Sequence, residues 1–156
     1  MKSKIELNVT VDDEQWTENT DFDAVKVAEE LRDLAFAYVA DACEHELLAL
    51  DKTYEVNVCL SNDAEVQRLN KEFRGKDKPT NVLSFACIDD DEFWDMLDKS
   101  TDMELGDIIL AFETLQREAD EKHITVYAHY CHLLVHGFLH ILGFDHQTCL
   151  LYTSPS

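Results

Sequence analysis

The periodicity of the apolar residues restricts the fold of this chain most, because it switches repeatedly between that of a strand and that of a helix. Strands are expected where apolar residues alternate with polar ones or form a short buried run, at 5–11, 54–60, 82–86 and 105–111. Helices are expected where apolar residues recur three and four apart, at 22–50, 64–73, 112–122 and 125–142. The pattern predicts an α+β fold of the α/β-layer type, a small mixed sheet of about four strands surrounded by about five helices.

Turn residues support this division. Ser61 or Asn62 can cap the start of the helix over 64–73, Gly75 can end it, and Pro79 prevents it from restarting. A chain of 156 residues with 46% hydrophobic residues is sufficient for one core. We expect a single domain over 1–146, followed by an atypical tail over 147–156 that lacks a helical period and is either truncated or irregular.

The composition argues against several classes of protein. The five cysteines are widely spaced without a C-x-x-C pair, which disfavours both a disulfide framework and a cysteine-built zinc site. No apolar run reaches about 18 residues, and the first 25 residues lack the apolar core of a signal peptide. A cytoplasmic protein without a membrane span is therefore expected.

Charge is distributed unevenly along the chain. The net charge of −20 repels polyanions and acidic lipid surfaces, so any nucleic-acid binding needs a local basic patch. The window 68–78 has a local charge of +3 and contains five of the 13 basic residues: Arg68, Lys71, Arg74, Lys76 and Lys78. These residues predict a phosphate-binding patch or, alternatively, ordinary solubilising charges near a helix end.

The segment 89–104 is the one compositionally biased stretch. It contains eight carboxylates and one lysine, with apolar residues among them. A solvated acidic loop or a short amphipathic helix is the simpler interpretation. A metal site or a partner-docking segment remains the alternative.

Histidines cluster on the last expected helix. At about 100° per residue, His129, His132, His136 and His140 fall within a stripe about 80° wide, and His146 follows the helix. Each of His123, His129 and His132, taken alone, is better explained as an ordinary structural histidine than as a ligand. His136 and His140, however, are spaced i, i+4, which lets two imidazoles converge on one metal ion.

A glycine after these two histidines can bring in a third ligand. Gly143 can adopt the left-handed conformation that ends a helix, and the returning chain would then deliver His146. Three histidines with an open fourth position suit Zn²⁺ best, although imidazole also binds nickel, copper and iron. Gly137 occupies the position where metalloproteases carry their glutamate base, so a protease is disfavoured.

Three runs carry a family resemblance: F-R-G-K-D-K-P-T-N-V-L-S-F at 73–85, L-G-D-I at 105–108 and H-G-F-L-H-I-L-G-F-D-H at 136–146. The sequence from Tyr54 to His146 resembles the YbeY family of single-strand-specific endoribonucleases, which act in bacterial ribosomal RNA maturation. The resemblance implies a small mixed sheet with helices around it and one Zn²⁺ per chain, held by His136, His140 and His146. It also implies a required arginine, at Arg74. Members of the family continue past the last histidine into an acidic helix, which this tail replaces.

The expected function is therefore zinc-dependent cleavage of single-stranded RNA in ribosomal RNA maturation and ribosome quality control. The metal ligands and Arg74 are the expected catalytic groups. Residues expected to bind RNA are Arg68, Lys71, Arg74, Lys76, Lys78, Thr80, Asn81 and Ser84. Ribosomal proteins are a further class of partner, and neither DNA nor a membrane is expected. The alternative is a non-catalytic ribosome-assembly module in which zinc is structural.

Overall fold

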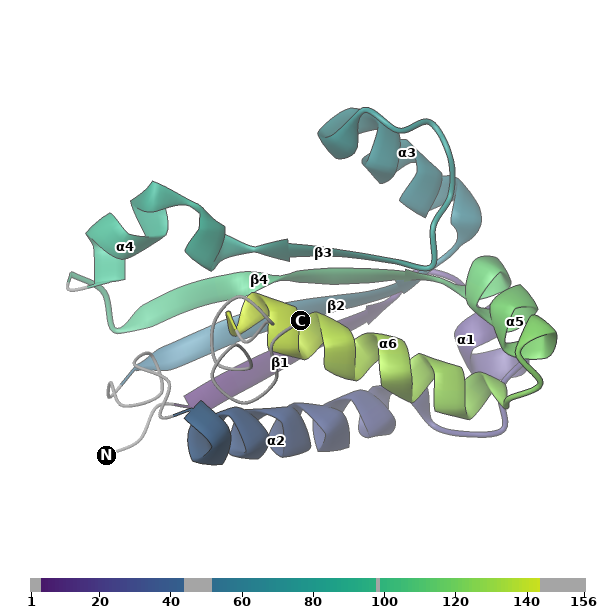
Figure 1. Cartoon of the computed structure of the whole chain (residues 1–156), viewed down its shortest axis with the longest axis horizontal. Helices are drawn as coiled ribbons and strands as arrows, with labels where there is room; N and C mark the ends of the chain where they lie inside the picture. The colour runs from purple at the N-terminus through teal and green to yellow at the C-terminus, as the bar shows by residue number, and fades with distance from the viewer. Residues whose placement is uncertain (1–3, 44–51, 98, 144–156) are drawn as a thin grey trace.

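The computed structural model describes residues 4–43, 52–97 and 99–143, which form a sheet covered by helices (Figure 1). The strands in the described residues are β1 (Lys4–Val11), β2 (Thr53–Ser61), β3 (Val82–Ala86) and β4 (Asp102–Ala111). Their order in the sheet is β1-β2-β4-β3. Strands β1, β2 and β4 run parallel and β3 pairs antiparallel with β4. The predicted mixed four-stranded sheet and fold class are confirmed.

The helices divide between the two faces of this sheet. They are α1 (Gln15–Glu18), α2 (Ala24–Cys43), α3 (Asp63–Arg74), the 3₁₀ turn η2 (Cys87–Asp89), α4 (Asp91–Leu97), α5 (Phe112–Glu121) and α6 (Val126–Ile141). Helices α2 and α6 lie side by side across one face, whereas α3 lies on the opposite side, over β3 and β4 (Figure 1). Among the described residues, α3 contacts β3 and β4 but leaves the same face of β1 and β2 partly open.

Burial follows the two-residue period of the strands. The inward residues of β2 are fully buried in the main core, which they share with α2 and α6: Tyr54, Val56, Val58 and Leu60. A smaller cluster forms between the sheet and α3: Val66, Leu83, Ile109 and Ala111. The alternation seen in the sequence therefore reflects one deeply covered face and one partly covered face.

The predicted ends of α3 are confirmed. The side chain of Asn62 caps the helix by accepting a hydrogen bond from the amide of Glu65 at 2.9 Å. Gly75 ends the helix in the left-handed conformation, with φ of +68°. For the helix expected over 22–50, the described part is α2, and residues 44–51 lie outside the described residues.

Two elements differ from the sequence prediction. Helix α1 was not expected, because a single turn is too short to show a helical period. It is anchored by buried Trp16, whose indole donates to the carbonyl of Ser61 at 2.7 Å. Strand β4 starts at Asp102 rather than at 105. The alternation of a strand is already present in these first residues, because Asp102 and Glu104 are exposed and Met103 between them is buried.

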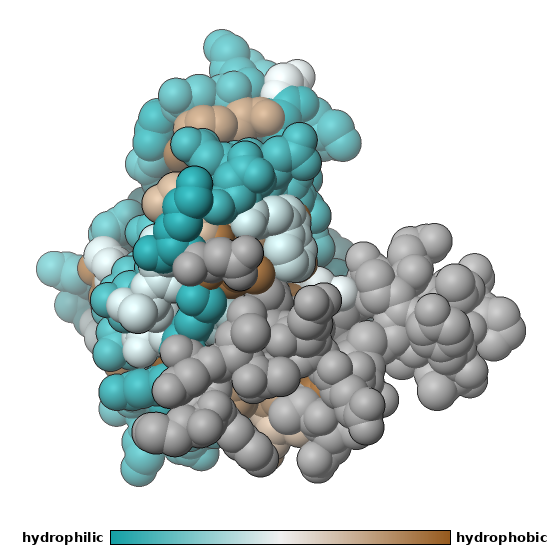
Figure 2. All heavy atoms as spheres, turned by 90° about the vertical axis from the view of Figure 1, so that its left-hand side faces the viewer, coloured by the Kyte–Doolittle hydropathy of each residue, from teal (hydrophilic) through white to brown (hydrophobic). Residues whose placement is uncertain are grey.

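The acidic segment 89–104 contains helix α4 and the first residues of strand β4. Helix α4 is short and amphipathic, with Phe93 buried, as one interpretation expected. The described residues at this end of the molecule are mostly hydrophilic at the surface (Figure 2). Across the described parts of the chain, no three potential metal ligands lie together and no helix is long and apolar enough to span a membrane.

Candidate active site

A cleft of about 650 Å³ opens along β3, which is an edge strand of the sheet that the described residues form. Its walls are the end of α3 with the loop that follows, β3 itself, and one face each of α5 and α6. Basic side chains line it: Arg74, Lys76, Lys78 and Arg117. His136, His140, Thr80, Asn81 and Ser84 also line it, so the structure brings most of the predicted site residues into one cleft.

The two histidines come from successive turns of α6. His136 is exposed and His140 is half-buried. The hydroxyl of Ser84 forms a hydrogen bond with Nδ1 of His140, at 2.8 Å. With Nδ1 engaged, Nε2 is the ring nitrogen left for a metal, an arrangement typical of metal-binding histidines.

The third expected ligand, His146, lies outside the described residues, as does the expected tail over 147–156. The turn that would lead to His146 starts as predicted. Gly143 has φ of +79°, and its amide donates to the carbonyl of His140 at 3.0 Å. Helix α6 therefore ends at Ile141, one residue after the second histidine.

The packing at position 137 explains why the first histidine is followed by a glycine and not by a glutamate base. Gly137 is buried where α6 packs against β4, and a Cβ placed on it would lie 3.0 Å from Cδ1 of Ile108. A glutamate at this position would meet Ile108 instead of entering the cleft. This face of the helix is occupied by core packing, which agrees with the disfavoured protease interpretation.

Arg74 is held at the edge of β3 by two contacts. One guanidinium nitrogen, Nη2, donates to the carbonyl of Ser84 at 2.9 Å, and Cζ lies 5.2 Å from the centroid of the Phe85 ring. Ser84 thus contacts Arg74 through its carbonyl and His140 through its hydroxyl. One residue of an edge strand therefore links the two groups from which chemistry is expected.

The loop between α3 and β3 is fixed by a buried asparagine. Asn70 is only 3% exposed, and its side-chain amide donates to the carbonyl of Lys78 at 2.9 Å. The amide of Lys76 donates to the carbonyl of Asn70 at 3.2 Å. These bonds hold the loop that carries both lysines against α3.

The basic window is split by the fold. Arg68 pairs with Glu65 and Glu72 on α3, and Nζ of Lys71 lies 3.9 Å from a carboxylate oxygen of Asp77. Neither Arg68 nor Lys71 lines the cleft. Arg117, which the sequence analysis did not single out, lines it instead, and no local pattern within acidic α5 marks it.

A carboxylate also lines the cleft. Oε1 of Glu118 accepts from the side-chain amide of Asn81 at 2.9 Å and from Nε2 of buried His129 at 2.8 Å. Burial alone would raise the pKa of Glu118, but the hydrogen bonds from His129 and Asn81 outweigh this effect and lower the pKa from its ordinary value. Glu118 is therefore ionised at neutral pH, and His129 is a buried, hydrogen-bonded histidine.

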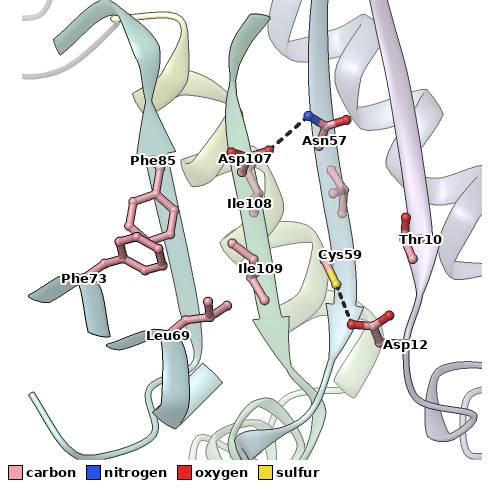
Figure 3. Close-up of a pocket in the computed structure, with 11 residues that line it drawn as sticks. Thr10, Asp12, Asn57, Cys59, Leu69, Phe73, Phe85, Asp107, Ile108 and Ile109 are labelled. Atoms are coloured by element: carbon pink, nitrogen blue, oxygen red, sulfur yellow. Dashed lines mark hydrogen bonds between the residues drawn. The ribbon is translucent and has the colours of Figure 1, made fainter. Parts of the chain in front are cut away.

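A second groove, of about 600 Å³, lies on the partly open face of the sheet (Figure 3). Phe73 and Phe85 form one wall, and Asn57 donates to Asp107 at 3.0 Å across its floor. Burial, together with a nearby carboxylate, raises the pKa of Cys59 to about 12. The groove is lined by the carboxylates of Asp12 and Asp107 and, among the described residues, by no lysine or arginine, so its charge is opposite to that of the cleft.

Comparison with known proteins identifies the family. The family model described as Endoribonuclease YbeY matches residues 4–149. The chain belongs to the YbeY family. Curated relatives named Endoribonuclease YbeY include one from Sphingopyxis alaskensis, 51% identical over 114 residues, and one from Magnetococcus marinus, 52% identical over 95 residues. These alignments cover 72% and 60% of this chain, but 62% and 65% of the relatives.

The chain therefore spans less than two thirds of the length of these curated YbeY relatives. A solution structure of a Thermotoga maritima protein has the same fold, with a TM-score of 0.50 and 22% sequence identity. That match covers 90% of this chain and 75% of the other.

Proposed function

We propose that this chain is a zinc-dependent endoribonuclease that cleaves single-stranded RNA during ribosomal RNA maturation and ribosome quality control. The observation that carries the proposal is the cleft in which His136 and His140 face a wall of basic side chains that includes Arg74. The names of the YbeY relatives support the same reaction.

His136, His140 and His146 would hold one Zn²⁺. The donor set fits this ion, because neutral imidazoles are common zinc ligands and Ser84 leaves Nε2 of His140 available. When bound, the ion supplies a Lewis acid that polarises a phosphoryl oxygen and lowers the pKa of a water molecule.

The protein groups then bind and orient the RNA. The guanidinium of Arg74 has five N–H donors, of which one goes to Ser84, so others remain for the oxygens of the phosphate under attack. Lys76, Lys78 and Arg117 bind flanking phosphates, while Thr80 and Asn81 offer uncharged hydrogen-bonding groups. Arg68 and Lys71, which lie outside the cleft, contribute longer-range attraction only.

We propose ribosomal RNA as the partner and the cytoplasm as the location of the protein. Outside the cleft, the chain is strongly acidic, with a net charge of −20 overall. A surface of this sign is complementary to basic ribosomal proteins, which are the second proposed class of partner.

The test is incubation of metal-loaded protein with a short unstructured RNA. We expect the wild type to cleave, His140→Ala to lose cleavage and metal together, and His132→Ala to retain both. His132 is a matched control because it is an exposed histidine of the same helix that does not line the cleft. A 2′,3′-cyclic phosphate at the cut would indicate attack by the ribose hydroxyl, and a free 3′-hydroxyl would indicate attack by water.

Tight metal binding without cleavage would contradict the enzymatic function. It would instead favour the non-catalytic assembly module with structural zinc.

A further inference from the structure

Asn81 is held at both ends in the cleft. Its backbone carbonyl accepts from the amide of Ala111 at 3.0 Å, and its side-chain nitrogen donates to Glu118 at 2.9 Å. It lies directly before β3, three residues from Ser84. Because the amide nitrogen is directed at Glu118, the amide oxygen Oδ1 is directed away from that carboxylate. The side chain is therefore oriented before any ligand binds.

Glu118 is itself fixed from behind. The ring of His129 is 1% exposed, and its Nε2 approaches the same carboxylate oxygen that accepts from Asn81. An ionised carboxylate only accepts hydrogen bonds, so both neighbours donate to it. The hydrogen bonds that join His129, Glu118 and Asn81 therefore lead from the core between α5 and α6 to the surface of the cleft.

This carboxylate is unfavourable for phosphate binding by itself. Glu118 is 30% exposed in a cleft lined by basic side chains, and its negative charge opposes an approaching phosphate. A role confined to charge would predict that its removal strengthens RNA binding. Its hydrogen bond to Asn81 points to a different role.

We propose that Glu118, backed by His129, is a positioning residue that presents Oδ1 of Asn81 as an acceptor for a hydrogen-bond donor of the RNA. The donor is either a ribose 2′-hydroxyl or a base N–H, since an uncharged amide suits these groups better than a phosphate. This inference rests on the proposed function, because it concerns how the same cleft holds RNA.

The first test measures binding of a fluorescein-labelled single-stranded RNA by anisotropy. We expect Glu118→Ala to weaken binding about fivefold to tenfold although it removes a negative charge. Glu118→Gln should largely restore binding, because its amide oxygen can still accept from Asn81. Glu121→Ala is the matched control, as it removes the same charge from α5 outside the cleft, and it should leave binding unchanged or slightly tighter.

A double-mutant cycle separates positioning from a structural role. In an Asn81→Ala background, Glu118→Ala should have little further effect on binding. An equal loss in both backgrounds would mean that Glu118 only ties α5 to α6, and tighter binding by Glu118→Ala would mean that it acts only through charge. Either result would overturn the proposal.

A second readout does not depend on RNA. In wild-type protein the side-chain amide protons of Asn81 should give two separate NMR signals that are protected from exchange, and Glu118→Ala should remove that protection. Unprotected signals in the wild type would overturn the proposal. Because neither readout needs turnover, a wild type that does not cleave would contradict the proposed function while these tests still decide the role of Glu118.

The same oligonucleotide made with 2′-deoxyribose identifies the donor. If the donor is the 2′-hydroxyl, Asn81→Ala weakens binding of the RNA but not of the DNA. If the donor is a base N–H, both ligands lose affinity equally. Binding of both ligands that is unaffected by Asn81→Ala would overturn the proposal.

Discussion

Replacement of Ser84 by alanine should weaken metal binding without removing any metal ligand. The hydroxyl of Ser84 is 2.8 Å from Nδ1 of His140, and this is the hydrogen bond that leaves Nε2 available for the ion. Loss of such an outer contact typically costs tenfold to a hundredfold in metal affinity, or about 1.4 to 2.7 kcal/mol. Because His140 is only half-buried, water can replace part of the lost bond. We therefore expect the lower half of this range, about tenfold to thirtyfold.

The assay is competition for Zn²⁺ between the protein and a chromogenic chelator at neutral pH. Thr80→Ala serves as the control, because it removes a hydroxyl from the same cleft, and it should bind Zn²⁺ as the wild type does. His140→Ala gives the zinc affinity that is expected when one of the proposed ligands is lost. The contact with Arg74 should survive in Ser84→Ala, since it uses the backbone carbonyl.

If Ser84→Ala matches the wild type in zinc affinity while His140→Ala does not, the hydroxyl plays no part in orienting the ring. The reasoning that links β3 to the metal ligand would then be refuted.

Three further predictions concern stability and RNA cleavage. Gly106→Ala should lower the free energy of unfolding in urea by about 2 kcal/mol or more, because the added Cβ would lie 2.2 Å from a backbone carbonyl of β3. At Gly75 an added Cβ would meet open space, so Gly75→Ala should lower the free energy of unfolding only by the strain of an alanine in the left-handed conformation, about 1 kcal/mol. Arg74→Ala should slow single-turnover cleavage by about 10² to 10³-fold. Lys76→Ala should mainly weaken RNA binding, in a salt-dependent way. If both variants slow cleavage equally and low salt restores both, Arg74 only attracts the RNA electrostatically. Because the folded-state pKa of Glu118 is lowered, its contribution to stability is present above about pH 4.5 and is lost as the pH falls through the folded pKa. Thermal unfolding of Glu118→Gln should accordingly vary less over this acidic range than that of the wild type.

The fold was predictable wherever the period of the apolar residues was long enough to read. The strands and the three helices that position the cleft appear near their expected ranges, and both glycines expected to end a helix, Gly75 and Gly143, have positive φ. Helix α1 could not be read, because its only deeply buried residue is Trp16. The start of β4 was hidden because its exposed residues belong to the acidic segment.

The site was predictable to the extent that it is local in sequence. His136 and His140 share a cleft with Arg74 as expected, since the motifs of the family carry them together. Arg117 and Glu118 could not be found in the same way, because they join the cleft only when α5 packs against α6 and α3. The sequence analysis assigned Arg68 to RNA binding, although its spacing from Glu65 and Glu72, three and four residues away on the same helix, is that of an ion pair.

In the sheet formed by the described residues, β3 is an edge strand, and its edge lines the cleft in which we propose that RNA is cleaved. An edge strand leaves backbone groups without sheet partners, and such groups invite unwanted pairing with another chain. Here Arg74 donates to one of these carbonyls, that of Ser84, while α5 and α6 complete the cleft beside the strand. In the proposed function, the guanidinium that covers this edge carbonyl is also the one that binds the RNA. A substitution that frees Arg74 from β3 should consequently affect both solubility and RNA cleavage, whereas neutralising Lys78 should affect RNA binding alone.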